Sequence, residues 1–431
     1  MGRLSVEALR SLSELGRLRE ELDALDAVAR RPSPFATVEY IEAFLAHDEY
    51  GTREDELLAL VAREDGHVVG WLPLRKHRAR AGRVPFGRIG VLVSHDTDRP
   101  CVVARREDEE RVARAFWDYL LRRERGWSLV ELAMQDDTSA LRHVPPLAPW
   151  RFWTRRFENM PVSCIPMHGS LEAYYDALHT NERHNVRRSI KRTLDAGRVE
   201  CACGDDPRAT RELLGLYLDV ERRSWKEAAR AGVRRDPRRV AFFEALCDAR
   251  QPMHLGVDLL LLDDLPIAGN VTGAYGDVLY GLEMCFDEDY EALACGRFAS
   301  LLVIRRAVAM GAREINMNGN YAYYKARVGA EVTPTFAVQV FRVGSVPWLK
   351  ARAGDALRAL RKREEKPPEF NPERRAHEEH APIPPPRERE RSEARATLAA
   401  LEARGAKVER FSGADLAQPI LAKAKKSKEA A

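Results

Sequence analysis

Residues 278–319 constrain the fold most strongly, because the hydrophobic pattern changes its period twice within this stretch. Residues 278–286 (VLYGLEMCF) alternate with period two, which is typical of a strand. Residues 293–311 (LACGRFASLLVIRRAVAMG) are mostly apolar and follow a loop with one glycine, which is typical of a buried helix. The segment REINMNGN then returns to a strand pattern. The order of strand, loop, buried helix and strand predicts a helix packed against a sheet.

Further strands are predicted on both sides of this segment. ELLALVARED and HVVGWLPLRKHR are separated by Asp65-Gly66, a strong hairpin signal. HLGVDLLLL, IAGNVTGAY and VLYGLEMCF follow one another through short turns, as in an antiparallel meander. The sequence therefore predicts an α+β fold with a mixed, mainly antiparallel central sheet and flanking helices.

The length of 431 residues favours two folded units over one. Both predicted units follow the order helix, strand hairpin, more strands, helix, strand, which suggests two copies of one architecture. We expect an N-terminal helix and linker, a first unit, a second unit that begins with a basic helix over 170–196, and a charged, proline-rich, largely disordered tail; these cover residues 1–35, 36–150, 151–344 and 345–431.

Composition excludes several classes of protein. The 70 basic and 66 acidic residues nearly balance, which argues against a dedicated nucleic-acid binder. Seven cysteines without framework spacing favour a reducing, cytoplasmic setting, and the pair Cys201 and Cys203 has no partner motif for a metal. We find no signal peptide and no apolar run of membrane-spanning length, so we expect a cytoplasmic protein without stable membrane insertion and without a metal.

Two carboxylates are candidates for proton transfer. Glu283 lies in the middle of the strand predicted at 278–286, and burial of its face would favour its protonated form. A core ion pair with an arginine, or an exposed sheet face, is the alternative. In ERRSWKEAARAG, Glu221 and Trp225 are four residues apart and would share one helix face, with Lys226 off that face.

The loop before the helix at 293–311 is a candidate anion site. The first amides of a helix have no intrahelical partner, and the helix dipole adds partial positive charge there. Gly296, Arg297 and Phe298 would present such amides to a phosphate. The basic helix, which contains Arg183 and Arg187, could contact phosphates as well or could simply be a solvated face.

Four segments together resemble GNAT-superfamily acyltransferases. HTNERHNVRRSIKRTLDAG, ERRSWKEAARAG, YEALACGRFASLLVIRRAVAMG and INMNGNYAYYKARVGAE are similar to motifs of the CelD/BioF-like acetyltransferase branch, which is related to the FemAB peptidyltransferases. The resemblance covers about residues 165–343, and a degenerate first copy would account for 36–134. It implies two GNAT-like domains in tandem, as in FemAB-like proteins.

The resemblance also implies a reaction and roles for single residues. An acyl group, acetyl by expectation, would pass from acyl-CoA to an amine or hydroxyl of a small-molecule or cell-envelope acceptor. The expected roles are a base at Glu283 or, second, Glu221; a thiolate acid at Tyr324, with Tyr321 and Tyr323 as competitors; acyl-CoA contacts at Met284, Phe286, Gly296, Arg297 and Phe298; and acceptor contacts at Trp225, Lys226, Asn318 and Lys325.

Two positions depart from the family pattern. Cys295 stands where the family has a proline before the loop glycine, and Asn316 stands where it has an aspartate after the strand. Because Asn316 removes a carboxylate, a non-catalytic scaffold that retains the fold is one alternative. The other is a FemAB-like transferase that uses aminoacyl-tRNA and acts on a peptidoglycan precursor, with tRNA as its partner.

Overall fold

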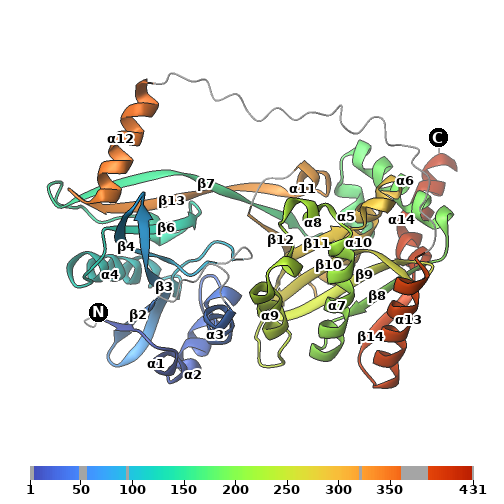
Figure 1. Cartoon of the computed structure of the whole chain (residues 1–431), viewed down its shortest axis with the longest axis horizontal. Coiled ribbons are helices and arrows are strands. Elements are labelled where there is room, and N and C mark those ends of the chain that lie inside the picture. The colour runs from blue at the N-terminus through green and yellow to red at the C-terminus, as the bar shows by residue number, and fades with distance from the viewer. Residues whose placement is uncertain (1–3, 48–55, 94–96, 320–322, 361–386, 430–431) are drawn as a thin grey trace. The chain divides into compact units, whose positions relative to one another are not determined.

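The computed structural model describes residues 4–47, 56–93, 97–319, 323–360 and 387–429 (Figure 1). The chain divides into two compact units, and it passes from one to the other three times. Unit 1 contains residues 1–162 and 333–370, and unit 2 contains residues 163–332 and 371–431. Two of the crossings fall within the long strands β7 (Phe152–Pro166) and β13 (Glu331–Arg342). Each unit is therefore built from two separate stretches of sequence.

Unit 1 is a sheet with helices against it. Its strands follow the order β1-β2-β3-β4-β6-β13-β7, and β5 pairs with β3. The remaining elements of this unit are β1 (Ser5–Leu9), α1 (Leu12–Gly16), α2 (Arg19–Asp26), η1 (Pro34–Ala36), α3 (Val38–His47), β2 (Glu56–Glu64), β3 (His67–Ala81), β4 (Val84–Val91), β5 (Val103–Ala104), α4 (Glu109–Arg122), β6 (Leu129–Gln135), η2 (Ala140–Arg142) and α12 (Val346–Leu360).

The predicted hairpin at Asp65-Gly66 is present in unit 1. Both residues have positive φ, 51° and 89°, as a two-residue hairpin turn requires. The core of this unit forms where α4 places Phe116, Trp117 and Leu120 against the strands, because these residues recur at helical spacing. The prediction of a helix at the N-terminus is wrong for residues 5–9, since β1 pairs antiparallel with the edge of β2.

Unit 2 has a corresponding sheet in the order β12-β11-β10-β9-β8-β14, with the last residues of β7 next to β12. Its elements are α5 (Leu171–Ala177), α6 (Thr180–Ala196), β8 (Val199–Gly204), α7 (Pro207–Arg222), α8 (Trp225–Ala229), η3 (Val233–Arg235), α9 (Pro237–Leu246), β9 (His254–Leu262), β10 (Leu265–Tyr275), β11 (Val278–Phe286), η4 (Glu288–Leu293), α10 (Cys295–Ala309), β12 (Glu314–Gly319), α11 (Tyr323–Arg327), α13 (Glu388–Ala403), β14 (Val408–Ser412) and α14 (Gly413–Glu429).

Helices cover both faces of the unit 2 sheet. The predicted apolar helix is α10, and its residues Phe298, Leu301 and Leu302 are 0–1% exposed in the core against one face. On the other face α7 packs so closely that a Cβ at Gly269 would lie 3.0 Å from the ring of Tyr217. The helix of residues 293–311 is thus apolar because it packs on the sheet, as the sequence predicted.

A β-bulge at Leu282 changes the faces of β11. Gly281 pairs with Thr272 of β10 while Glu283 pairs with Val271, so Leu282 has no partner there. The bulge reverses the alternation that follows it. Glu283 therefore shares its face with Tyr280, whereas the uninterrupted period-two alternation predicted for 278–286 would place these two residues on opposite faces.

The parallel ladder between β11 and β12 is short. It joins Val278–Tyr280 to Glu314–Asn316 and does not extend past the bulge. Unit 1 repeats this arrangement, since β4 and β6 are parallel over three pairs, from Arg88–Leu129 to Gly90–Glu131. In both units an antiparallel hairpin, a helix and a parallel strand follow one another. The predicted fold class, a mixed α+β fold with two copies of one architecture, is confirmed.

The C-terminal residues complete unit 2, although a largely disordered tail was predicted from Pro-rich and charged composition. β14 pairs antiparallel with β8 over 408–412, and Leu416, Ala417 and Ile420 of α14 enter the core. Ion pairs hold the preceding helix: Arg395 contacts Asp264 at 2.6 Å. The small apolar residues of 413–421 bury little surface alone but fill a core that is already formed.

Truncation of a side chain in α14 tests this packing. Ile420 is fully buried, so Ile420→Ala should lower the free energy of unfolding by about 2–5 kcal/mol in urea denaturation. Val332→Ala, at a residue 45% exposed, is the control and should change little. Equal unfolding curves for Ile420→Ala and the wild type would contradict the placement of α14.

Acid sensitivity provides a second test, in unit 1. Burial, with Arg75 and Arg88 nearby, lowers the pKa of His77 from 6.5 to about 4. Between these pH values the unfolded chain takes up a proton that the folded chain refuses, so the free energy of unfolding falls as the pH drops from 6.5 to 4. His77→Gln should show a shallower fall than the wild type, whereas the exposed control His168→Gln should not.

Candidate functional site

A cluster of buried charges lies on β11 next to the bulge. Glu283 accepts hydrogen bonds from Lys226 through one carboxylate oxygen and from Arg239 through the other. The side chains of all three residues are only 8% exposed. Arg239, which lies in α9, was not predicted from any sequence pattern. The alternative of a core ion pair for Glu283 is thus what the structure shows, with a lysine as the second cation.

A break between α7 and α8 brings Lys226 into the cluster. α7 ends at Arg222, and Ser224 caps α8 by accepting a hydrogen bond from the amide of Lys226. The prediction that Glu221 and Trp225 share a face of one helix is therefore wrong. Trp225 is 46% exposed, while Lys226 turns inward and its ammonium lies 3.7 Å from Glu221 Oε1.

The remaining contacts hold Glu221 in place beneath Lys226. Glu221 is 1% exposed, and its Oε2 accepts a hydrogen bond of 2.8 Å from the amide of Arg234. A Cβ at Gly232 would lie 2.7 Å from the same oxygen, so only glycine lets this loop approach. Burial opposes the charge of Lys226, but Glu283 and Glu221 raise its pKa above the usual value. The ammonium stays charged between two carboxylates.

Two hydroxyls and a thiol surround the cluster. The Tyr217 hydroxyl lies 3.4 Å from Lys226 Nζ. Burial raises the pKa of Tyr217 and of the Cys285 thiol, so both stay protonated at neutral pH. Tyr324 is 43% exposed and close enough to feel the charges of Lys226 and Glu283; partial burial raises its pKa as well. The roles predicted for Tyr324 and Glu283 stay a prediction, and Tyr321 lies outside the described residues.

Helix α10 begins at Cys295, so part of the segment predicted as a loop is already helical. Ala294, with φ 54°, caps the helix, and the Arg297 amide donates to the Ala294 carbonyl at 3.0 Å. Cys295 and Gly296 are the first two helical residues, so their amides have no partner inside the helix. The Cys295 thiol lies beside both amides. Phe298 is fully buried and is part of the core.

Gly296 and Arg297 have contacts that limit what else they can bind. A Cβ at Gly296 would lie 2.9 Å from the ring of Phe286, so glycine is required for β11 and α10 to pack. Arg297 lies 3.8 Å from Glu182 of α6. Helix α6 holds this turn through its buried side, where Ser189 donates to the Ala294 carbonyl at 3.0 Å. Of its basic residues, Arg192 donates to the Ala292 carbonyl at 3.4 Å.

The end of β12 is fixed by its own side chains. Asn316 is buried, and its Oδ1 accepts a hydrogen bond of 2.9 Å from the amide of Asn318. Asn318 has φ 56° and is 7% exposed. The ammonium of Lys325 donates to the carbonyls of residues 317, 318 and 319 at 2.7, 3.2 and 2.9 Å. Lys325 therefore caps the strand end.

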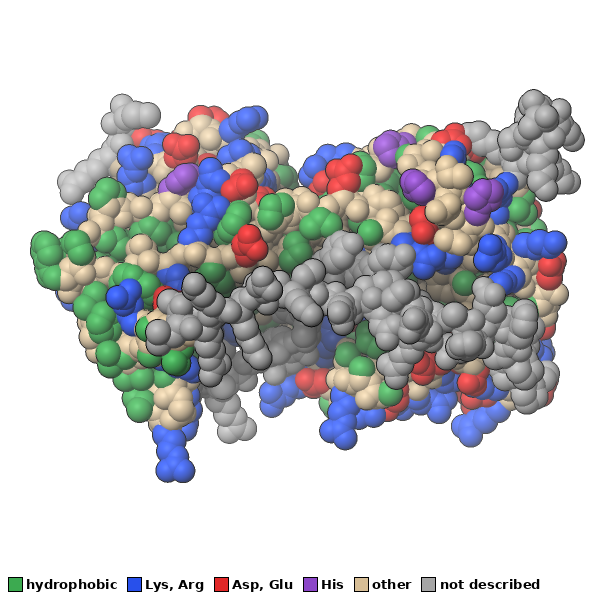
Figure 2. All heavy atoms as spheres, turned by 90° about the horizontal axis from the view of Figure 1, so that it is seen from above, with side chains coloured by type: hydrophobic (Ala, Val, Ile, Leu, Met, Phe, Trp, Pro, Cys, Tyr) green, Lys and Arg blue, Asp and Glu red, His purple; other side chains and the backbone are tan. Residues whose placement is uncertain are grey.

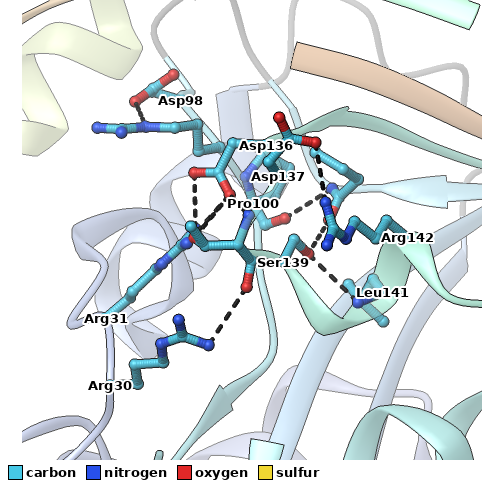
Figure 3. A network of polar contacts seen from close by, with 12 residues as sticks. Arg30, Arg31, Asp98, Pro100, Asp136, Asp137, Ser139, Leu141 and Arg142 are labelled. Atoms are coloured by element: carbon cyan, nitrogen blue, oxygen red, sulfur yellow. Dashed lines mark hydrogen bonds and ion pairs between the residues drawn. The ribbon is translucent and has the colours of Figure 1, made fainter. Parts of the chain in front are cut away.

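The corresponding positions in unit 1 carry a different set of charges (Figure 3). Arg30 contacts Glu109 at the start of α4 at 2.6 Å. Arg31 contacts Asp136, after β6, through two hydrogen bonds of 2.9 and 3.0 Å, as Figure 3 shows. Three acids, Asp108, Glu109 and Glu110, stand at the start of α4, whereas α10 has none in its first turn. An anion would be repelled at α4, so the predicted anion site concerns α10 alone.

Other parts of the described chain add little to the site. A cavity of about 330 Å³ in unit 2 is lined by α10, β8, β9 and β14 and contains none of the predicted site residues. Arg306, which lines this cavity, forms an ion pair of 2.7 Å with the buried Asp258. Within the described ranges no group of His, Cys, Asp and Glu could hold a metal ion. No helix in the described part of the chain has the length and apolarity needed to cross a bilayer.

Residues 180–326 match the family model of an acetyltransferase (GNAT) domain. No curated protein matches the chain. Among solved structures, FemX has a TM-score of 0.54 at 9% identity, over 74% of this chain and 95% of its own. The L-PGS from Bacillus licheniformis (0.46, 12%, over 80% and 97%) and a tandem GNAT protein from the clavulanic acid biosynthesis pathway (0.40, 13%, over 80% and 99%) are also similar. Residues 180–326 are thus similar to a GNAT acetyltransferase domain, and the chain has a fold similar to that of FemX.

The balance of charges in the cluster can be tested by stability. Lys226→Met leaves Glu221 and Glu283 buried without their shared cation, so it should lower the free energy of unfolding by about 3–5 kcal/mol. Lys226→Met combined with Glu283→Gln should recover part of this loss, and the exposed control Lys191→Met should be neutral. Additive losses in urea denaturation would show that the two residues are not coupled.

Proposed function

We propose that unit 2 transfers an acyl group from acyl-CoA to an amine or hydroxyl of a small-molecule or cell-envelope acceptor. The match of residues 180–326 to a GNAT domain supports an acyltransferase-type domain. The observation that carries the proposal further is the position of Glu283, which lies on β11 past the last residue paired with β12. In this proposal Tyr324 of α11, whose pKa is influenced by the charge of Glu283, supplies the hydroxyl. An acceptor at this point would meet a carboxylate and a protonated hydroxyl together.

The donor would lie along the part of β11 that has left the ladder with β12. In this proposal the thioester arm follows residues 283–286, with Met284 and Phe286 as contacts. The pyrophosphate lies at the start of α10, on the amides of Cys295 and Gly296, which have no partner inside the helix. The Arg297 amide is engaged by Ala294, so Arg297 would contribute the charge of its side chain.

Glu283 would accept the proton of the acceptor. A carboxylate has about four lone-pair positions, and Lys226 and Arg239 occupy one on each oxygen. The free positions can accept the N–H or O–H of the acceptor as its nitrogen or oxygen attacks the thioester carbon. Because Lys226 and Arg239 hold the carboxylate, its direction is fixed before the acceptor binds. Glu221, which is buried, would position Lys226 rather than meet the acceptor.

Tyr324 would protonate the leaving group. When the carbon–sulfur bond breaks, the CoA thiolate takes a proton, and a hydroxyl is a suitable donor. Its raised pKa keeps Tyr324 protonated at neutral pH, so it can act as the proton donor there. Of the predicted acceptor contacts, Trp225 is exposed and stays proposed. Lys226 and Lys325 are buried, Lys226 is paired with Glu283, and Lys325 donates its three N–H groups to backbone carbonyls, so neither is proposed to contact the acceptor. Asn318, 7% exposed, is not proposed to contact the acceptor either.

The roles of Glu283 and Tyr324 are tested by release of CoA thiol from acetyl-CoA with a set of amine acceptors. Glu283→Gln and Tyr324→Phe should each lower kcat by about 10²–10⁴-fold and leave acetyl-CoA binding in calorimetry unchanged. Glu288→Gln, at an exposed carboxylate, is the control. If both variants keep full turnover, the assigned roles are wrong; if the wild type binds tRNA and not acetyl-CoA, the aminoacyl-tRNA alternative holds.

A further inference from the structure

Helix α12 of unit 1 presents an apolar stripe to solvent. Leu349 and Leu357 are each 55% exposed, and Ala353 and Ala356 are exposed between them. At ~100° per residue these four side chains lie on one face of the helix. A surface helix normally turns its apolar face toward the core, and here the outer face is apolar.

Cations border this stripe on both sides. Lys350 and Arg352 are exposed and lie at the two edges of the apolar face on the helical wheel. Asp355, the acid of α12 within 346–360, lies 3.6 Å from Arg155. The outward face of α12 therefore combines aliphatic side chains with positive charge and carries no acid.

The hairpin on which α12 packs extends the same character. α12 contacts both β3 and β4. Residues 75–88 contain six Lys or Arg and no Asp or Glu, and among the described residues neither Arg80 nor Arg83 has a carboxylate partner. Val84, at the hairpin tip, is 47% exposed. On the part of the surface that belongs to unit 1, Figure 2 shows hydrophobic side chains beside Lys and Arg.

An exposed tryptophan lies near the start of α12. Trp150 is 77% exposed. The backbone carbonyl of its neighbour Arg151 accepts a hydrogen bond of 3.0 Å from the amide of Val343, which lies shortly before α12. Tryptophan is enriched where protein meets the headgroup region of a bilayer, since its ring is both apolar and polar. We call α12, the β3–β4 hairpin tip and Trp150 the basic–apolar face.

We propose that the basic–apolar face binds peripherally to an anionic lipid surface. Aliphatic side chains flanked by Lys and Arg are the pattern of a helix that lies in the plane of a membrane interface. Arginines of the hairpin would meet the anionic headgroups, each contributing to the attraction. The proposal does not depend on the acyl transfer proposed for unit 2.

Other occupants fit the face less well. A second copy of the chain in a symmetric contact would bring Lys350, Arg352 and the hairpin arginines against themselves. The chain's own segment 361–386 has as many basic as acidic residues, so it is not complementary to a cationic face. RNA would satisfy the cations, but phosphates and sugars would leave Leu349 and Leu357 without apolar partners.

Co-sedimentation of the full chain with vesicles tests the proposal. The protein should pellet with vesicles of equal parts phosphatidylglycerol and phosphatidylcholine, should not pellet with phosphatidylcholine alone, and should be released by salt. Leu349→Ser/Leu357→Ser should weaken binding at least tenfold. Arg80→Gln/Arg83→Gln should weaken it about 25-fold, at about fivefold per charge.

Matched controls and a second ligand make the result decisive. Val28→Ser and Arg389→Gln change exposed residues outside the face and should leave vesicle binding unchanged. Circular dichroism and a thermal melt verify that each variant is folded, and Leu349→Ala/Leu357→Ala replaces the serine variant if that one unfolds. The proposal is overturned if anionic vesicles do not bind, if the leucine variants bind as well as the wild type, or if total tRNA binds more tightly than vesicles and is lost in Arg80→Gln/Arg83→Gln.

Discussion

The ion pairs that Glu283 makes with Lys226 and Arg239 are the contact on which the geometry of unit 2 depends. Each ion taken out of water costs several kcal/mol unless its partners are well placed. Three local features place them: the bulge at Leu282 turns Glu283 to the face of α7, the break after Arg222 turns Lys226 inward, and α9 supplies Arg239. Without the bulge, the break or Arg239, at least one of these buried charges would lack its partner. The irregular backbone and the charges therefore require each other.

The sequence predicted the order of elements well, because that order follows from local patterns. The hairpin at Asp65-Gly66, the meander and the apolar helix α10 all depend on residues near one another in the chain. The bulge was not predictable, because VLYGLEMCF alternates regularly and the extra residue appears only against β10. The break between α7 and α8 was missed for a similar reason. A serine can lie inside a helix or cap one, and the sequence does not show that Ser224 caps α8.

The candidate site was predicted in part. The charge of Glu283 influences the pKa of Tyr324, and the roles expected for these two residues stay a prediction. Arg239 was missed, since an arginine among other arginines in α9 carries no sign of burial. Within the tail, the one helix expected at 393–404 is present as α13, but the disorder predicted for the rest of 387–429 is wrong, because composition measures whether a segment can fold alone. It does not measure whether a segment can complete an existing sheet, as β14 does.

The division of each unit into two stretches of sequence has a consequence for synthesis on the ribosome. Unit 1 needs β13, which is made only after the central strands of unit 2, and β8 keeps an unpaired edge until residues 408–412 emerge. An open edge strand is a template for pairing with another chain. Neither unit can complete its fold until the second of its two stretches has been synthesised. The emergence of residues 408–412 thus closes the open edge of β8 and ends the period in which that edge favours aggregation.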